Sequence, residues 1–487
     1  MKDNRIPSPF ISLLPVFVLI LLLFVTIRVF GSDALSGGSQ VCLLTATAVC
    51  VLIGMAGYRR TWKDFELAIT NNIAGVSTAL IILLIIGALS GAWMISGVVP
   101  TLIYYGIQVI HPHFFLVSTC VICAIVSVMT GSSWTTIATI GIALMGIGKA
   151  QGFSEGWIAG AIISGAYFGD KVSPLSDTTI LASSVTDTPL FTHIRYLMIT
   201  TIPSLVITLI IFTVAGLSHE ATDTGHITEY MQALDSKFNI SWWLMIVPVV
   251  TGVLIARKVP SVITLFISTT LATVFALIFQ PDLLREIAGL TALFKGGMGM
   301  LFGGTQLETG SAEINELVAT RGMSGMMNTI WLIVCAMCFG GAMTAGGMLG
   351  SITSVFIRFT KRRIGMVSST VASGLFLNLA TADQYISIIL QAKRKTPHPC
   401  HPFFKRILRD TRLNQQKTQP ISCIQFDLCL ICHLFVLFLH SNPMTQATIL
   451  SVPTLTYLPY SFFNLISPLM SITVAVIGYK IKKKITE

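Results

Sequence analysis

The sequence predicts an all-α fold, that of a polytopic integral membrane protein with about a dozen helical elements, some of them discontinuous or re-entrant. Two observations lead to this prediction. Hydrophobic residues make up 53% of the chain and charged residues only 11%, with a mean hydropathy of +0.79, whereas soluble domains carry roughly 25% charged residues. In addition, apolar runs long enough to cross about 30 Å of hydrocarbon recur along the chain.

The predicted membrane helices follow these runs. The first run is too long for the apolar part of a secretory signal and lacks a small-residue cleavage pattern, so we interpret it as the first transmembrane helix. No soluble domain is visible, and we expect one transmembrane domain over residues 1–487. The clearest runs are Phe10–Phe30, Val41–Gly57, Ile73–Trp93, Phe114–Met129, Ile194–Gly216, Trp242–Ala256, Ser261–Phe279, Thr329–Met348, Gly365–Leu390 and Ser461–Tyr479.

Basic residues in short loops predict the orientation, because Lys and Arg accumulate on the cytoplasmic side. The loop His219–Phe238 carries four acids against one Lys and suits the outer face. Both termini are therefore predicted to be cytoplasmic. The net charge of +10 largely reflects this topology and gives no reason to expect nucleic acid as a partner. The predicted cytoplasmic clusters are Lys2 and Arg5, Arg59 to Lys63, Arg257 and Lys258, Lys361 to Arg363, and Lys480 to Lys484.

The stretch "GAYFGDKVSPLSDTTILASS" places Asp170, Lys171 and Asp177 between apolar flanks. An ionised side chain at bilayer depth costs about 2.5–3.5 kcal/mol, so such residues persist where they pair, face water or bind something. A surface loop would carry these charges at no cost, but the apolar flanks argue against it. Gly169 and Pro174 break the helix here, and the unwound carbonyls and hydroxyls of a discontinuous membrane helix can coordinate cations.

Three further stretches carry polar groups within apolar sequence. Small residues can also serve close helix packing, which is the alternative interpretation of the first and the last of them. Asp383 is a second intramembrane carboxylate without an obvious partner, and Glu308 is a weaker candidate. The polar residues are Ser132, Ser133, Trp134, Thr135 and Thr136 in the first stretch, Asn378, Thr381, Asp383 and Gln384 in the second, and Thr305, Gln306 and Glu308 in the third.

Transport driven by nucleotide is not supported, because the stretch "IGIALMGIGKAQG" has Ala143 and Ala150 where a phosphate-binding loop needs Gly and Ser or Thr. The sequence predicts neither an enzyme nor a cofactor, so an ion gradient must supply the energy. A carboxylate that holds either a proton or a metal cation is the simplest exchanger, because competition for one site couples the two fluxes. A weak internal repeat, which pairs Pro189 with Pro453 and Tyr196 with Tyr460, favours a transporter.

The stretches "GSSWTTIATIGIALMGIG", "GAYFGDKVSPLSDTTILASS" and "NLATADQYISIIL" resemble the NhaC-type Na+/H+ antiporters of the ion transporter superfamily. The resemblance implies a bacterial inner-membrane (plasma-membrane) antiporter that exports Na+ in exchange for protons. It also implies two inverted repeats, roughly residues 40–216 and 242–479. Some members exchange Na+-lactate for protonated malate, so an organic anion antiporter of the same fold is the second candidate. A channel ranks third and a membrane redox protein last.

By position, the resemblance carries the ion and proton site onto this chain. We expect Asp170 and Asp177 to alternate between protonated and Na+-bound states, with hydroxyls and carbonyls completing an oxygen cage. Lys171 is expected to neutralise a carboxylate when the site is empty. The expected partners are Na+, H+ and membrane lipid, and a homodimer is compatible with the sequence. The remaining predicted ligands are Asp383, Ser132, Ser133, Thr135, Thr178, Thr179, Asn378 and Thr381, supported by Lys171, Trp134, Gln384 and Glu308.

Residues 391–449 depart from this pattern. Within 391–420, eight basic residues face only Asp410, although the predicted topology would place them outside, against the positive-inside rule. The repeat offset of 264 maps residues 170–186 onto 434–450, which contain no acid. We interpret the segment as the product of a shifted reading frame. Its motif "CLICH" matches a c-type haem attachment pattern but lies in an apolar run with no evident second axial ligand.

Overall fold

The computed structural model describes residues 7–30, 37–185, 189–219, 224–288, 293–309, 314–315, 318–357 and 441–477. Within these ranges the chain forms helices, and a single isolated β-bridge joins Thr305 to Thr320. Seven of the described helices are long and apolar enough to cross a membrane, and the bent pair Ile227–Lys237 and Trp242–Ala256 would make an eighth span. The predicted all-α membrane fold is thus confirmed in its coarse form.

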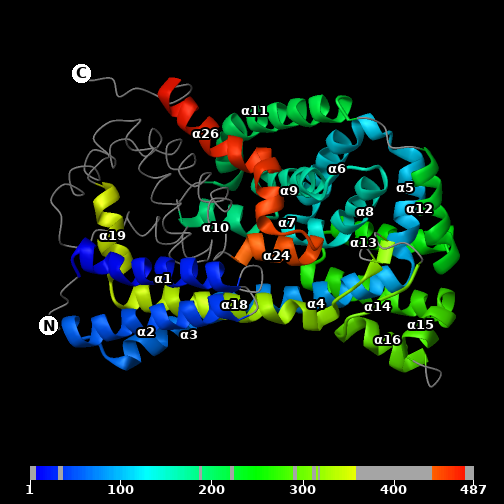
Figure 1. Cartoon of the computed structure of the whole chain (residues 1–487). Coiled ribbons are helices and arrows are strands. Elements are labelled where there is room, and N and C mark those ends of the chain that lie inside the picture. The colour runs from blue at the N-terminus through cyan, green and yellow to red at the C-terminus, as the bar shows by residue number, and fades with distance from the viewer. Residues whose placement is uncertain are drawn as a thin grey trace.

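One layer of the molecule is built from helices of both halves of the chain, which lie side by side in Figure 1. A Cβ at Gly87 would lie 2.6 Å from the carbonyl oxygen of Gly322, and one at Gly341 would lie 2.7 Å from the Cα of Ile69. The end of α18 therefore packs on α3 and its start packs on α4, so α18 runs antiparallel to the α3–α4 path. The helices are α1 (Pro9–Phe30), α2 (Gly38–Tyr58), α3 (Trp62–Gly75), α4 (Ser77–Ile95) and α18 (Gly322–Ala345).

Two helix breaks in this layer have the same geometry. α4 is followed by Gly97 with a φ of 84° and then by α5 (Val98–Val109), while α18 is followed by Gly347 with a φ of 71° and then by α19 (Met348–Ile357). Glycine adopts this left-handed conformation without the steric cost that other residues meet. The two glycines are 250 residues apart, whereas Pro189 and Pro453 are 264 apart.

The second body contains a helical hairpin, formed by α6 and the returning elements α7, η3 and α8, together with α9, α10 and α11. α6 packs along α9 so closely that a Cβ at Gly165 or Gly169 would overlap the backbone of α6. The end of α8 lies beside the segment that precedes α6, because Gln151 Nε2 donates to the carbonyl of Ile110 at 2.7 Å. The elements are η2 (Pro112–Phe114), α6 (Phe115–Thr130), α7 (Ser133–Thr136), the π-helix η3 (Ile137–Gly141), α8 (Ile142–Ala150), α9 (Glu155–Val172), α10 (Asp177–Val185) and α11 (Leu190–Leu217).

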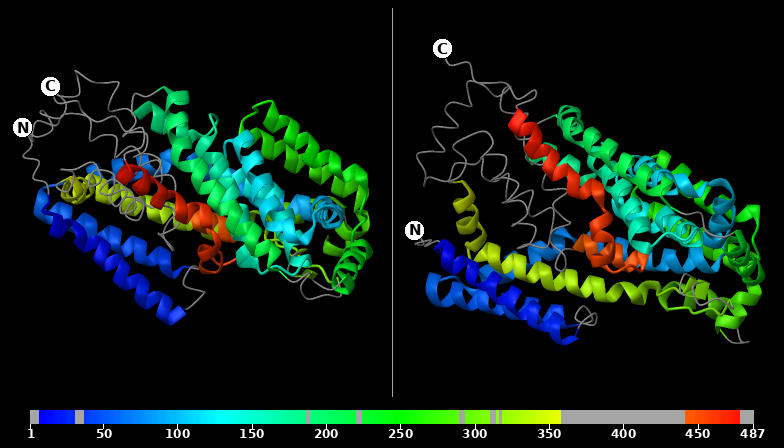
Figure 2. Two further views of the ribbon diagram at one scale, coloured as in Figure 1. Left: turned by 90° about the horizontal axis from the view of Figure 1, so that it is seen from above. Right: turned by 45° about the horizontal axis from the view of Figure 1, so that its top comes forward.

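The C-terminal helices pack against α9 and α11 of this body (Figure 2). Gly160 of α9 admits Tyr460, whose carbonyl oxygen would lie 2.5 Å from a Cβ at that position, and Phe212 of α11 packs edge-on against Phe462 at 5.5 Å. Pro189 precedes α11 and Pro453 precedes α25 with nearly the same backbone angles. The elements are α24 (Ser441–Leu450), α25 (Thr454–Tyr457), η7 (Leu458–Tyr460) and α26 (Phe462–Ile477).

The remaining helices connect the two bodies. The predicted run Ile73–Trp93 is not one helix: α3 ends at Gly75 and α4 begins at Ser77, with Val76 between them. That break was not predicted, because the apolar pattern continues through it. The predicted helix Gly365–Leu390 lies outside the described residues. The connecting elements are α12 (Thr224–Lys237), η4 (Trp242–Met245), α13 (Ile246–Ala256), α14 (Ser261–Phe279), α15 (Pro281–Ala288) and α16 (Leu293–Phe302).

Candidate functional site

Two helix breaks of the second body, one after α6 and one after α9, lie against each other. Gly131, whose φ is 68°, caps the end of α6, and Ser132 caps the start of α7 by accepting a hydrogen bond from the Thr135 N–H at 3.2 Å. α9 ends at Val172, and α10 begins at Asp177. A Cβ at Gly131 would lie 2.6 Å from the carbonyl carbon of Leu175. Because α6 and α9 pack along their length, the two breaks face each other directly.

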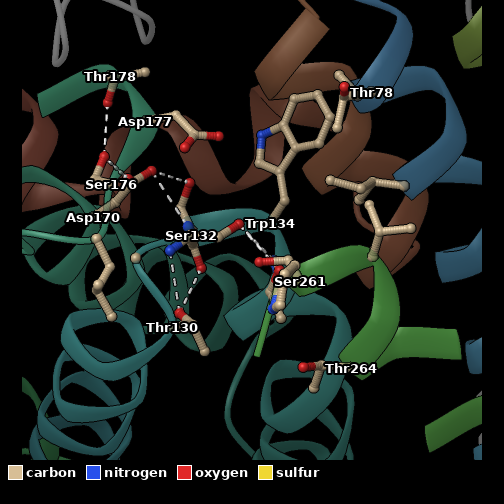
Figure 3. Close-up of a pocket in the computed structure, with 18 of the residues that line it drawn as sticks. Thr78, Thr130, Ser132, Trp134, Asp170, Ser176, Asp177, Thr178, Ser261 and Thr264 are labelled. Atoms are coloured by element: carbon tan, nitrogen blue, oxygen red, sulfur yellow. Dashed lines mark hydrogen bonds between the residues drawn. The ribbon is translucent and has the colours of Figure 1, made fainter. Parts of the chain in front are cut away.

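Asp170 lies in the last turn of α9 and points at the facing break (Figure 3). Its Oδ2 accepts hydrogen bonds from Ser133 Oγ at 2.8 Å and from the Ser133 N–H at 3.3 Å. Its Oδ1 accepts one from Ser176 Oγ at 2.7 Å, and Ser176 Oγ lies 2.9 Å from Thr178 Oγ1. Both carboxylate oxygens are therefore held in place by donors at the two breaks, from Ser133 at the start of α7 and from Ser176 between α9 and α10.

These groups line a cavity of about 380 Å³ between the two bodies. Asp170, Asp177 and Trp134 line it on the side of the broken helices. In Figure 3 the Trp134 ring projects between Asp177 and Thr78, which belongs to α4. Helix breaks thus supply charged and hydroxyl groups to a cavity whose far wall comes from distant parts of the chain.

The far wall includes the turn between α13 and α14 and the break between α3 and α4. Lys258 and Ser261 from that turn line the cavity, and so does Val76. Lys258 is exposed, and it belongs to a basic pair that the positive-inside rule assigns to the cytoplasm. On the predicted orientation, the cavity therefore lies at the cytoplasmic end of these helices.

The structure brings together most of the predicted site residues that it describes. Asp177, which the sequence pairs with Asp170, is exposed, whereas Asp170 is half-buried. The pair is thus unequal, because only Asp170 accepts the hydroxyl donors of the helix breaks. The predicted residues that line the cavity are Ser132, Ser133, Trp134, Thr135, Asp170, Asp177 and Thr178.

Other predicted residues lie elsewhere. Lys171 is fully buried and does not line the cavity. Its Nζ donates to Ser467 Oγ of α26 at 2.8 Å and lies 5.7 Å from the ring centre of Phe463. Thr179 is buried, and its Oγ1 donates to the carbonyl of Lys171 at 3.1 Å. Glu308 is exposed in the segment after α16, away from the cavity.

The second polar stretch cannot be compared with the structure. The predicted ligands Asn378, Thr381 and Asp383, together with Gln384, lie outside the described residues. The haem-like motif lies outside them too. Within the described ranges, no group of three or more His, Cys, Asp or Glu residues is arranged to hold a metal ion.

Some lining residues were missed by the sequence analysis. Ser176 lies within the stretch that contains Asp170, and its position between Pro174 and Asp177 could have identified it. Thr78, Lys258 and Ser261 carry no such signal, because each belongs to an ordinary helix start or loop. Oxygen atoms from carboxylate and hydroxyl groups dominate the Asp170 end, and this chemistry suits a hard cation.

Comparison with known families gives a match that covers the second of the two helix breaks. The sequence profile of the Na+/H+ antiporter family matches residues 165–394. This range contains Asp170, Asp177 and the second polar stretch. It ends within the first residues of the basic segment that departs from the expected pattern, which begins at residue 391.

Curated relatives match over most of their length. The Na+/H+ antiporter NhaC of Alkalihalophilus pseudofirmus is 34% identical over 90% of this chain and 90% of its own. The malate-2H+/Na+-lactate antiporter of Bacillus subtilis is 34% identical over 96% of this chain and 94% of its own. The Na+/H+ antiporter NhaC of Bacillus subtilis is 34% identical over 85% of this chain and 87% of its own.

Proposed function

This chain belongs to the Na+/H+ antiporter family, and we propose that it exchanges Na+ for protons at Asp170. Its relatives are named as antiporters, so the chain is a multi-pass membrane transporter and not an enzyme. The observation that carries the proposal is the carboxylate of Asp170 at the meeting point of two helix breaks, held by three donors beside a cavity.

The donors around Asp170 suit a site that is occupied by either cation in turn. A hydroxyl can rotate, so Ser133 and Ser176 donate to the carboxylate when Na+ is absent and offer a lone pair to Na+ when it is bound. A proton on the carboxylate removes the charge that attracts Na+. The two cations therefore exclude each other, and this exclusion couples their fluxes.

Asp177 plays a different part in this proposal. Its exposed position on the cavity wall places a negative charge where a cation enters. A charge in water-accessible surroundings attracts Na+ only weakly, by about 1 kcal/mol at 4 Å. Asp177 thus raises the local Na+ concentration, and Asp170 provides the exchange site.

We further propose two inverted repeats, roughly residues 40–216 and 242–479, within one transmembrane domain, and both termini in the cytoplasm, as the basic clusters of the sequence favour. The support comes from the left-handed glycines 97 and 347 and from the antiparallel packing of α18 on α3 and α4. The proline caps of α11 and α25 add to it. Discontinuous helices in corresponding halves are typical of secondary transporters.

Exchange that involves an organic anion is the second candidate. The malate-2H+/Na+-lactate antiporter is as similar in sequence as the NhaC relatives. The two functions share the cation site at Asp170 and differ in what accompanies the cation. The shifted-frame interpretation of residues 391–449 applies to both, because that segment includes nearly all of residues 434–450, onto which the repeat offset maps the stretch around Asp170.

The test compares three versions of the chain in inside-out vesicles, with a pH-sensitive dye that reports the proton gradient after NaCl is added. The chain as written is compared with a version whose residues 391–449 are replaced by sequence from a relative, and D170N is introduced into whichever version is active. We expect D170N to abolish the Na+-dependent signal. The matched control is D235N, which removes an exposed acid of α12 and should leave exchange unchanged.

Each result has a clear meaning. Exchange that is lost in D170N and retained in D235N, at equal membrane insertion, supports the proposed site. Exchange retained in D170N would falsify it. Activity of the repaired version alone would identify the written chain as a damaged antiporter. Silence from both until lactate or malate is added would favour the second candidate.

A further inference from the structure

The cavity carries opposite charges on its two walls. Asp170 and Asp177 line it on the side of the broken helices, and Lys258 lines it at the turn between α13 and α14. From this arrangement we propose that Lys258 binds the carboxylate group of a small organic acid that enters the cavity together with Na+. This inference rests on the proposed cation site at Asp170 and names the second occupant of the same cavity.

The volume of the cavity supports a second occupant. One water molecule has a share of about 30 Å³ in the liquid, so 380 Å³ greatly exceeds what a partly dehydrated Na+ ion needs. Sites for small organic ligands enclose about 300–1,000 Å³. The Trp134 ring, which projects into the cavity in Figure 3, offers the apolar surface that the carbon skeleton of such a ligand requires.

The backbone at Lys258 is unusual. Its φ is 59°, in the left-handed region that favours glycine. Its N–H donates to the carbonyl of Ile255 at 2.8 Å, which closes the turn after α13. Arg59 adopts the same left-handed conformation after α2, so this geometry ends the helix, and it is the position of Lys258 on the cavity wall that distinguishes it. The turn fixes the backbone of Lys258 at the cavity wall.

Comparison with Arg257 distinguishes ligand binding by Lys258 from a role in membrane orientation. Both residues are exposed, and both belong to the basic pair that favours a cytoplasmic loop. Arg257 caps α13 and does not line the cavity, whereas Lys258 does. An ammonium beside a pathway for Na+ alone would repel the ion. A carboxylate ligand removes that conflict, because it lies between the bound Na+ and the ammonium and is attracted by both.

The experiment measures binding by the purified full-length chain, so that it does not depend on transport. Thermal unfolding is followed while lactate or malate replaces chloride at constant Na+ and constant ionic strength, and again with choline in place of Na+. We expect a saturable stabilisation by at least one of the two acids that requires Na+, because a ligand that binds only the native state raises the unfolding temperature.

The variants assign the effect to one side chain. We expect K258Q to raise the half-saturating concentration of the acid about tenfold, as loss of a charge-assisted hydrogen bond implies. K258R should restore most of the affinity, and R257Q should match the unchanged chain. Equal effects of K258Q and R257Q, or no stabilisation by either acid, would overturn the inference. The latter result combined with Na+/H+ exchange in chloride would overturn it and leave the proposed function standing.

Discussion

Asp170 and Lys171 are neighbours in sequence, yet they lie in two different surroundings on different faces of α9. Asp170 faces the two helix breaks and the cavity, and its carboxylate accepts hydrogen bonds from Ser133 and Ser176. Lys171 faces α26, where it is fully buried and donates to Ser467 beside the Phe463 ring. Successive residues of a helix point about 100° apart, which separates the two charges.

The difference shows that an intramembrane charge does not by itself mark an ion site. A site also needs space for the ion and hydroxyl groups that can turn their lone pairs toward it, and the Asp170 side of α9 has both. The Lys171 side is packed against α26, and its hydrogen bond joins two helices. We therefore propose that the Asp170 side exchanges ions and that the Lys171 side docks α26, and four substitutions can break or sharpen this division.

The largest effect is expected at Gly131, where the break after α6 contacts the break after α9. G131A adds a Cβ at a residue with a φ of 68° and only 2.6 Å from the backbone of Leu175, so the two breaks must separate. We expect exchange to fall to background in the vesicle assay while the protein still inserts. G57A is the control, because a Cβ at Gly57 would meet nothing within 4 Å. Normal exchange by G131A would show that the breaks need not meet.

Substitution of Lys171 should affect stability more than exchange. K171M removes the hydrogen bond to Ser467 and leaves a buried hydroxyl with one partner fewer, which costs about 1–3 kcal/mol. We expect an apparent unfolding temperature lower by several degrees, measured in detergent, with measurable exchange at low temperature. A variant of normal stability that has lost all exchange would contradict the division between the two sides of α9.

Removal of one donor to Asp170 should weaken Na+ binding. S176A deletes the hydroxyl that lies 2.7 Å from Oδ1 of Asp170, and with it the oxygen whose lone pair turns to Na+ when the ion is bound. We expect the half-saturating Na+ concentration of exchange to rise about tenfold or more. S204A is the matched control, since that hydroxyl donates only to its own helix in the described structure. Equal affinities for S176A and S204A would refute the role of Ser176.

The smallest effect is expected at Asp177, which is exposed. D177N removes a charge that acts through water, where attraction at 4 Å amounts to about 1 kcal/mol. We expect the half-saturating Na+ concentration to rise by at most about fivefold, with the maximal rate unchanged. The effect should shrink as ionic strength increases, because salt screens exposed charges. Complete loss of exchange would make Asp177, and not Asp170 alone, part of the exchange site.

Some of this organisation could be predicted from the sequence. The apolar runs identified α1, α2, α11 and α14 nearly to their ends, because a helix in lipid must be apolar over its whole length. The polar interruptions identified the break after α6 and the break after α9. Groups such as Asp170 and Ser133 are costly within the membrane and persist there where they pair, face water or bind something. The break at Val76 escaped prediction, since Val76 is as apolar as a continuous helix requires.

The sequence by itself determined the class of protein, the membrane-spanning runs and the chemistry of the two broken stretches around Ser133 and Asp170. These follow from composition and from the cost of polar groups in hydrocarbon. Tertiary structure alone decided which charge belongs to the cavity. The packing of α6 on α9 brought Ser133 to Asp170, and the packing of α26 on α9 enclosed Lys171. The turn at Lys258 reached the same cavity from a distant part of the chain. Such contacts depend on which helix faces meet in space, and no local pattern of residues records that.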